Sequence, residues 1–227
     1  TLFYVEHQES KKINELKKII TQRSGCLKNK DFNQLKYWDE QLIQIEPQIT
    51  KLNTQICNNI NEQLRNSEVV QLFSHKNPWL SNLFVKYTPG FSENSKFSDV
   101  LCENLEKDTL LKRTTAGPHK RSFDILLNNK AAEETLSRGQ QKIISIILHL
   151  IQREIIKTHT DLDPILLMDD ISSELDKENA NLMLKYLIDN SVQTIMTSIE
   201  KAHFSTQKDV FLFHVEHKGE TSYVKRL

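Results

Sequence analysis

The chain has 227 residues, of which 38% are hydrophobic and 26% charged, values typical of a folded globular protein rather than a disordered one. Thirty basic and thirty acidic residues leave a formal net charge of zero, so overall charge neither supports nor excludes nucleic-acid binding. Three widely spaced cysteines indicate neither a disulfide framework nor a CxxC zinc site, and no apolar run approaches the ~20 residues of a membrane span. We therefore expect a cytoplasmic protein that makes no membrane contact.

The sequence begins TLFYVEHQES, with no initiating methionine and no apolar leader segment. This opening predicts a piece of a longer protein. An N-terminus exposed by processing is the alternative.

The first part of the chain is expected to form a helical arm. Apolar residues recur three or four positions apart from Ile13 to Leu27 and again from Leu35 to Ile56, a pattern typical of two amphipathic helices with facing seams. Asp31 is placed to cap the second helix, with Gln34 as its capping-box partner. The short polar break between the helices predicts an antiparallel hairpin, and Pro47 predicts a kink in the second helix.

Beyond the arm, strand-like and helix-like segments alternate, which indicates an α/β sheet with helices on its faces. The strands are expected at 83–87, 123–127, 165–168, 192–196, 210–217 and 221–227, and the helices at 98–111, 141–158 and 177–189. We therefore divide the chain into a helical hairpin arm at residues 1–75 and an α/β part at residues 76–227.

Two aspartates follow a strand-like run in the segment PILLMDD. Four apolar residues directly before Asp169 and Asp170 indicate a buried parallel strand that delivers carboxylates to its C-terminal edge, where open α/β sheets bind ligands. Asp169 is suited to hold Mg²⁺ through water, because a hard cation prefers carboxylate oxygen, and Asp170 is suited to orient or deprotonate an attacking water. A strand followed by an aspartate-rich turn without a function would give the same string.

The segment LSRGQ precedes a helix and has the features of a phosphate-binding loop. Ser137 and Gln140 form a capping-box pair before the helix that starts near Gln141. A helix N-terminus offers unpaired N–H groups and a positive dipole end, and Gly139 lets a phosphate approach the backbone closely. Ser137 and Gly139 are therefore candidate phosphate contacts. An ordinary capped helix without a function would explain this segment by itself. It explains less well that LSRGQ, ILLMDD and SELD occur in this order.

These segments resemble motifs of ABC-type ATPases: LSRGQ the signature motif, ILLMDD the Walker B strand and SELD the D-loop. The runs TTAGPHKR, LSRGQQK and DDISSELD, with QRSGCLKN, YWDEQL and KYTPGF upstream, narrow the resemblance to the RecF family of bacterial DNA replication and repair proteins, in the SMC-like group. The resemblance covers nearly the whole chain. It implies the C-terminal part of a P-loop ATPase head with an inserted helical arm, called lobe II.

The resemblance assigns roles to residues of this chain. The signature loop would be Leu136, Ser137, Arg138, Gly139 and Gln140, and the D-loop would be Ser173, Glu174, Leu175 and Asp176. Many ABC-type ATPases have a sensor histidine after the strand that matches 192–196; this chain has Thr197 and Ser198 there, and either hydroxyl is a candidate γ-phosphate sensor.

The family further implies an ATPase of DNA replication, recombination and the SOS response. In this group the signature loop of one subunit closes over ATP held by another subunit's P-loop, so that ATP binding and dimerisation are one event and hydrolysis releases the clamp. The implied cofactors are ATP and Mg²⁺. The implied partners are duplex DNA near single-strand gaps, a second copy of the protein, and RecR and RecO. Together with RecR and RecO, the clamp would help to load the recombinase.

The other half of the nucleotide site is missing from this sequence. A P-loop needs GxxxxGK[ST], with two glycines five positions apart. The chain has five glycines, and the closest two, Gly117 and Gly139, are 22 positions apart. The resemblance implies a preceding lobe with the P-loop and Q-loop, and we expect this chain alone to be inactive as an ATPase.

Basic residues near the turn GPHK are candidate DNA contacts, namely Lys112, Arg113, Lys120 and Arg121. The family usually has Arg where this chain has Lys120, and lysine cannot reproduce a guanidinium fork, so the role of Arg121 as a substitute stays open. A second cluster on the first helix, with Lys11, Lys12, Lys17 and Lys18, is either a DNA contact or the solvated face of that helix.

Two other interpretations remain. Another SMC-like or ABC-type repair ATPase would share the three nucleotide motifs, although this arm is too short for the long coiled coil of SMC proteins. A non-enzymatic interaction module with degenerate nucleotide motifs is the second alternative. The presence of Ser137, Gly139, Asp169 and Asp170 together weighs against it.

Overall fold

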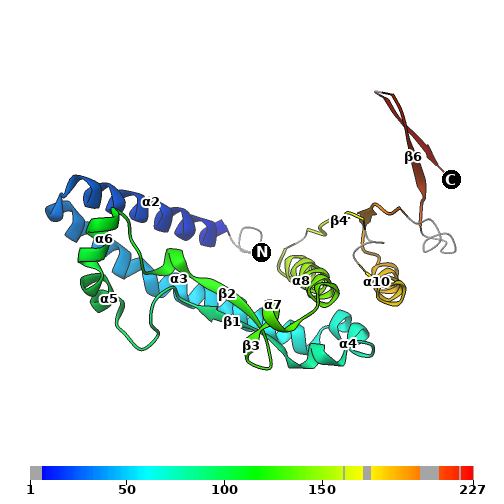
Figure 1. Ribbon diagram of the computed structural model, residues 1–227, viewed down its shortest axis with the longest axis horizontal. Coiled ribbons are helices and arrows are strands. Elements are labelled where there is room, and N and C mark those ends of the chain that lie inside the picture. Colours follow the sequence, from blue (N-terminus) through cyan, green and yellow to red (C-terminus); the bar gives the residue numbers. More distant parts are fainter. Residues whose placement is uncertain (1–6, 161, 171–174, 200–209, 220, 227) are drawn as a thin grey trace.

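The computed structural model describes residues 7–160, 162–170, 175–199, 210–219 and 221–226, and the structural statements below concern these residues. The molecule is elongated, with helices α2 and α3 toward one end and α10 with the C-terminal strands toward the other (Figure 1). In chain order the elements are α2 (His7–Asn29), α3 (Phe32–Asn66), α4 (Glu68–Ser74), η1 (Pro78–Asn82), β1 (Leu83–Thr88), α5 (Phe97–Glu103), α6 (Leu105–Leu111), η2 (Pro118–Lys120), β2 (Ser122–Leu127), β3 (Lys130–Ala131), α7 (Ala132–Thr135), α8 (Arg138–His159), β4 (Leu166–Met168), α10 (Lys177–Asp189), β5 (Thr194–Met196), β6 (Phe213–Lys218) and β7 (Thr221–Arg226). None of the helices in these ranges has the length and apolarity needed to cross a membrane.

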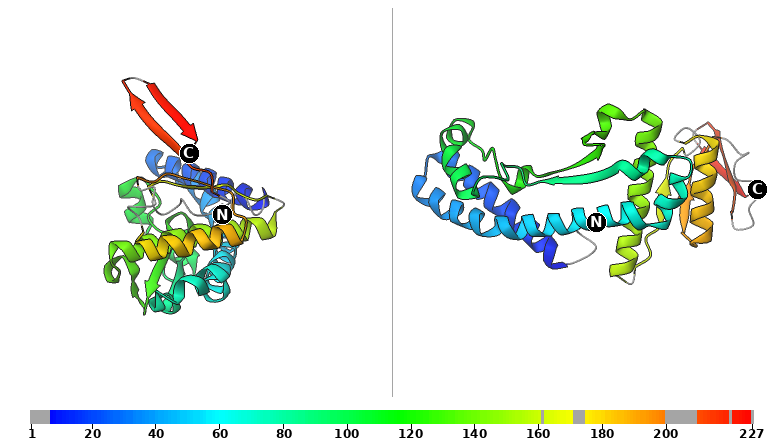
Figure 2. Two further views of the ribbon diagram at one scale, coloured as in Figure 1. Left: turned by 90° about the vertical axis from the view of Figure 1, so that its right-hand side faces the viewer. Right: turned by 90° about the horizontal axis from the view of Figure 1, so that it is seen from below.

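Helices α2 and α3 form the expected antiparallel hairpin (Figure 2). Lys30 has a φ of 55°, in the left-handed region that commonly ends a helix, and this lets the chain reverse. The carboxylate of Asp31 then accepts the N–H of Gln34 at 3.1 Å, which confirms the predicted N-cap. Helix α3 is one helix of 35 residues, and Pro47 lies inside it without ending it.

Two more helices, α5 and α6, pack on the arm. Phe97, Val100 and Leu101 of α5 share one apolar core with Ile13, Leu16 and Ile19 of α2 and Leu42, Ile45 and Ile49 of α3. The sequence pattern predicts one helix over 98–111, whereas the structure breaks it at Asn104, whose side chain donates to the carbonyl of Val100 at 2.8 Å. The core of the arm therefore includes segments that follow residue 75 in the sequence.

Strand β1 joins the long helix α3 to the first sheet. The side chain of Asn61 accepts the N–H of Val85 and donates to its carbonyl, both at 2.7 Å. Strand β1 pairs antiparallel with β2, from Leu83 opposite Leu127 to Thr88 opposite Ser122, and β2 pairs with β3. The strands predicted at 83–87 and 123–127 are confirmed.

Strands β4 and β5 form a separate parallel pair, with Leu166 opposite Thr194 and Met168 opposite Met196. Leu166, Met168 and Met196 pack against a large core built mainly from α4, β1, α8 and α10. On the other face Leu167 is 72% exposed and Ile195 61% exposed. Parallel strands are normally covered on both faces, so this pair presents an uncovered apolar surface. Strands β6 and β7 form the expected antiparallel hairpin at the C-terminal end.

A fully buried guanidinium ties the arm together. Arg23 donates to the carboxylates of Asp39 and Asp108, each at 2.6 Å, and to the hydroxyl of Thr114 at 2.9 Å. Asp108 is also fully buried and accepts the N–H and the hydroxyl of Thr115, at 2.9 and 2.6 Å. The network joins α2, α3, α6 and the loop that follows α6.

We expect Asp108→Asn to lower the free energy of unfolding by about 3 kcal/mol, because the buried charge of Arg23 then loses the fully buried one of its two carboxylate partners and keeps only Asp39. Glu106→Gln, an exposed change on the same helix, serves as control and should shift it by less than about 0.5 kcal/mol. Urea denaturation followed by circular dichroism measures both. A loss below about 1 kcal/mol for Asp108→Asn would show that the pair does not hold the arm together.

Candidate functional site

The two aspartates after β4 lie beside Thr197, which follows the neighbouring strand β5. Because β4 and β5 are parallel, both carboxyl ends meet at one edge. The hydroxyl of Thr197 donates to Oδ1 of Asp169 at 2.5 Å and accepts the N–H of Asp170 at 2.8 Å. The N–H of Thr197 donates to the carbonyl of Met168 at 3.0 Å. One threonine therefore holds the carboxylate of Asp169 and the backbone of Asp170.

The backbone of Asp170 is strained. Its φ is 41°, in the left-handed region that residues other than glycine rarely occupy. Such conformations persist where the surrounding structure enforces them, and they are enriched at functional sites. Here the bond from the Asp170 N–H to Thr197 is one of the contacts that enforce it.

The segment LSRGQ has the capped geometry that its sequence predicts. Ser137 accepts the N–H of Gln140 at 3.3 Å, and the side chain of Gln140 accepts the N–H of Ser137 at 2.9 Å. Leu136 is buried and anchors the loop, whereas Ser137, Arg138 and Gly139 are exposed. A Cβ atom added to Gly139 would meet nothing within 4 Å, so the fold itself does not require glycine there. The capping box is confirmed, and the start of α8 faces solvent.

The start of α8 and the end of β4 line one groove of about 590 Å³. The lining residues are Arg138, Gln141, Lys142, Ser145, Ile146 and His149 of α8 together with Leu166, Leu167, Met168 and Asp169. The structure thus brings Arg138 of the signature-like loop and Asp169 of the strand edge to the same groove. Ser137, Gly139 and Asp170 are not part of its lining.

The segment SELD is described only in its second half, because Ser173 and Glu174 lie outside the described residues. Leu175 is buried in the large core. Asp176 is the N-cap of α10 and accepts the N–H of Asn179 at 2.9 Å. This end of the D-loop-like segment is therefore anchored by its own helix.

A lysine that the sequence patterns did not indicate holds the same segment. Nζ of Lys76 lies 2.7 Å from a carboxylate oxygen of Asp176 and 2.7 Å from one of Glu178. Burial tends to raise the pKa of Asp176, but the N–H of Asn179 and the ammonium of Lys76 outweigh it and leave that pKa below its usual value. Asp176 is therefore a carboxylate at neutral pH.

The candidate DNA contacts differ in exposure. Lys112, Arg113 and Lys120 are exposed, whereas Arg121 is half-buried and donates to the carbonyl of Pro118 at 2.9 Å. On α2, Lys11, Lys17 and Lys18 are exposed and Lys12 is half-buried. Three of the four residues near GPHK thus have side chains that face solvent.

The GPHK turn has a fixed backbone. The N–H of Gly117 donates to the carbonyl of Gly90 at 3.0 Å, and a Cβ on Gly90, whose φ is 86°, would lie 2.4 Å from the Gly117 oxygen. His119 donates through Nε2 to the carbonyl of Thr114 at 3.1 Å. Burial lowers the pKa of His119, so the imidazole is neutral at neutral pH. The turn is therefore rigid, and its positive charge comes from the flanking Lys and Arg.

Curated proteins named DNA replication and repair protein RecF are similar to the chain in sequence. The one from Pseudoalteromonas translucida is 30% identical over 224 residues, which cover 95% of this chain and 60% of that protein. The one from Shewanella halifaxensis is 32% identical over 190 residues, covering 82% of this chain and 50% of that protein. The chain is a RecF homologue. It spans 50 to 60% of the length of these RecF relatives and matches their C-terminal part.

Solved RecF structures have the same fold. The structure of the recombination mediator protein RecF-ATP in the RecFOR pathway gives a TM-score of 0.70 at 21% identity, and the likeness covers 98% of this chain and 59% of that one. The RecF-ATPrS structure from the same pathway also gives 0.70, at 22% identity. This confirms the predicted fold class: the chain has the α/β fold, with a helical arm, of the corresponding part of solved RecF. No protein-family model matches the chain.

Replacing Thr197 tests the geometry of the strand edge directly. In Thr197→Val the two bonds to the aspartates are lost, and we expect the Asp170 amide to exchange its hydrogen about fivefold faster, equivalent to ~1 kcal/mol. Thr197→Ser keeps a hydroxyl, so its Asp170 amide should exchange hydrogen at nearly the rate of the chain without substitutions. Amide hydrogen exchange by NMR measures this. Equal rates in all three proteins would contradict the assigned role of Thr197.

Proposed function

We propose that the chain is the signature and Walker B half of an ATPase that acts in DNA replication and recombinational repair. The observation that carries the proposal is the strand edge, where Thr197 joins Asp169 and Asp170 beside the groove that begins at Arg138. The similarity to proteins named DNA replication and repair protein RecF, and to the solved structure of the recombination mediator protein RecF-ATP, supports it.

Asp170 would orient or deprotonate the water that attacks the γ-phosphate, a role that needs a fixed carboxylate. The left-handed backbone of Asp170 and the bond from its N–H to Thr197 fix the position of the backbone that carries this carboxylate. In this arrangement Thr197 acts on phosphate through the two aspartates, while Ser198 is the neighbouring hydroxyl for a direct contact. The γ-phosphate sensor role of either residue belongs to this proposal.

Asp169 would hold Mg²⁺ through water. Among the described residues no group of three His, Cys, Asp or Glu side chains is arranged for a metal. Mg²⁺ in nucleotide sites commonly takes one or two carboxylates and fills its other positions with phosphate and water oxygens, so the single exposed carboxylate of Asp169 fits that mode. When bound, the ion would neutralise phosphate charge.

The signature loop from Leu136 to Gln140 would contact ATP held by a second subunit. The start of α8 presents exposed backbone at Ser137 and Gly139, to which a phosphate could come close. The sequence has no pair of glycines at P-loop spacing, so the cradle for the same ATP must come from other residues. ATP would then add contacts that exist only in the dimer, which couples nucleotide binding to dimerisation.

Three exposed basic residues between the end of α6 and η2, Lys112, Arg113 and Lys120, would contact phosphates of duplex DNA near single-strand gaps, with Arg121 as a further candidate. Such contacts make binding fall steeply with salt and carry no sequence preference. With RecR and RecO the clamped dimer would help to load the recombinase. The D-loop assignment, Ser173 to Asp176, belongs to the same proposal.

The test uses the full-length protein, meaning this chain joined to a RecF-type lobe with a P-loop. Asp170→Asn should lower ATP turnover at least about 100-fold because the base is lost, while ATP-dependent dimerisation persists. Asp189→Asn, an exposed change at the end of α10, is the control and should leave both unchanged. Turnover is measured by phosphate release and dimerisation by analytical ultracentrifugation.

A full-length protein that neither dimerises with ATP nor hydrolyses it would favour the non-enzymatic interaction module. Under the proposal, the 227-residue chain alone should bind ATP with a dissociation constant well above the micromolar range. A micromolar constant for the chain alone would contradict the composite site.

A further inference from the structure

The D-loop-like segment is bonded to an element that continues the arm. Lys76, in the turn after α4, makes the two ion pairs to Asp176 and Glu178 described above. These residues are about a hundred positions apart in the sequence, and no periodic pattern connects them. The contact therefore joins two functional regions: the start of α10, which the D-loop leads into, and α4, which follows the arm helix α3.

A buried pair of amides reinforces the ionic contact. Asn77 donates through Nδ2 to the carbonyl of Phe73 at 3.1 Å and to Oδ1 of Asn179 at 2.9 Å. Asn179 donates in turn to the carboxylate of Asp176 at 2.9 Å. Asn77 is 6% exposed and Asn179 1% exposed, so neither amide has water as an easy alternative partner. Buried polar pairs of this kind fix one relative position of two elements.

Helix α4 follows α3 after a single residue with an extended backbone. Ser67 is the only residue between them, and its N–H donates to the carbonyl of Gln63 at 2.9 Å while its carbonyl accepts the N–H of Gln71 at 3.1 Å. Val69 and Phe73 of α4 are fully buried in the large core. The two helices are therefore joined by one hydrogen-bonded residue and not by a loop.

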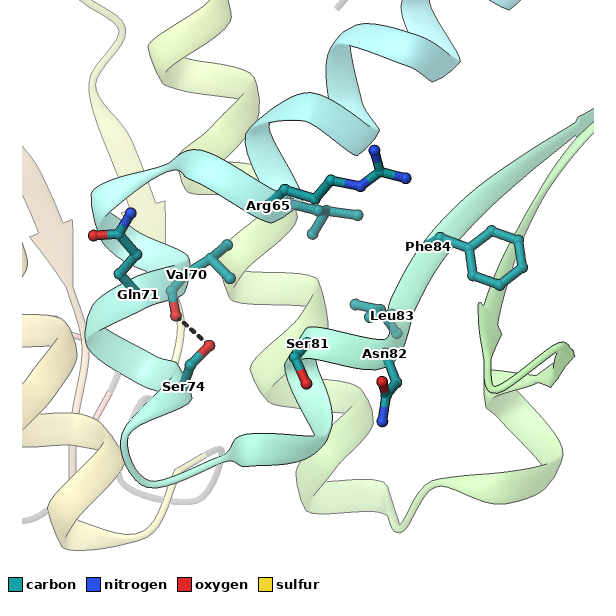
Figure 3. A pocket seen from close by; sticks show the side chains of 9 residues that line it. Arg65, Val70, Gln71, Ser74, Ser81, Asn82, Leu83 and Phe84 are labelled. Carbon is teal, nitrogen blue, oxygen red and sulfur yellow. Dashed lines mark hydrogen bonds between the residues drawn. The ribbon is translucent and has the colours of Figure 1, made fainter.

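On its other side α4 borders open space. A groove of about 450 Å³ lies between the end of α3, α4, η1 and β1 (Figure 3). Val70, Gln71 and Ser74 line it from α4, with Arg65 and Phe84 across from them. The turn that follows α4 is thus bonded to α10, and α4 itself borders the groove on another side. The groove gives α4 space to shift on this side.

We propose that Lys76 and Asn77 are positioning residues that couple the arm to the D-loop, so that DNA bound at the arm changes the rate of ATP turnover through α3, α4 and Asp176. The inference rests on the proposed ATPase function and adds its route of regulation. The contacts that form this coupling are the salt bridge from Lys76 to Asp176 and the buried amide pair of Asn77 and Asn179, at the N-cap of α10. When α4 shifts, Asp176 and the start of α10 shift with it.

The experiment measures ATP turnover of the full-length protein with and without gapped duplex DNA. For Lys76→Met with Asn77→Ala we expect the ratio of the two rates to fall to about one, because the D-loop no longer follows the arm. Lys76→Arg can still pair with both carboxylates and should keep most of the unchanged ratio. Lys185→Met, which replaces an exposed lysine of α10, is the matched control and should keep all of it.

Amide hydrogen exchange at residues 178–180 checks the local effect and should speed up in the double variant but not in Lys185→Met. If the double variant fails to fold, Lys76→Met alone, a change at the surface, should still lower the ratio at least twofold. The inference is overturned if a folded Lys76→Met protein has the same ratio as the protein without substitutions. It is also overturned if DNA does not alter the ATP turnover of the protein without substitutions. A protein without any ATP turnover would instead refute the proposed function.

Discussion

The apolar stripe of α3 is the constraint on which both ends of the molecule depend. Leu35 packs near the tip of the arm, Leu42 to Ile49 in the core shared with α2 and α5, and Cys57 with Leu64 in the core of the α/β part. A single helix of 35 residues, about 50 Å long, therefore supplies three cores. The arm cannot move as a unit without bending α3 or displacing α4, which packs against α8 and α10.

The chemistry of the site comes from backbone geometry more than from a cluster of side chains. Parallel pairing brings Asp169, Asp170 and Thr197 to one edge, and the capped start of α8 leaves its backbone open beside the same groove. What this arrangement lacks is a phosphate cradle, and the glycine spacing of the sequence does not supply one. The exposed Leu167 and Ile195 show that the strand pair also has a face left to cover. A composite site explains both features.

The features that the sequence predicted are local. Asp31 and Ser137 cap the helices that follow them, and the period of apolar residues locates the arm, because each depends on neighbours within a few positions. Contacts between distant segments leave no such pattern, so the bonds of Lys76 and Asn77 to α10 could not be foreseen. Arg23 is an intermediate case: it occupies a core position in the stripe of α2, where a charged residue signals a buried partner, but the sequence does not say that the partner is Asp108.

The central claim, that the signature loop serves ATP on another subunit, is tested most directly by mixing two inactive variants of the full-length protein. One carries a substitution of the P-loop lysine and the other carries Ser137→Arg. The account predicts that each alone is inactive and that an equal mixture recovers about a quarter of the unchanged turnover, since half of the dimers are mixed and each has one intact site. No recovery in a mixture that still forms mixed dimers would show that the loop acts within its own subunit and would contradict the account.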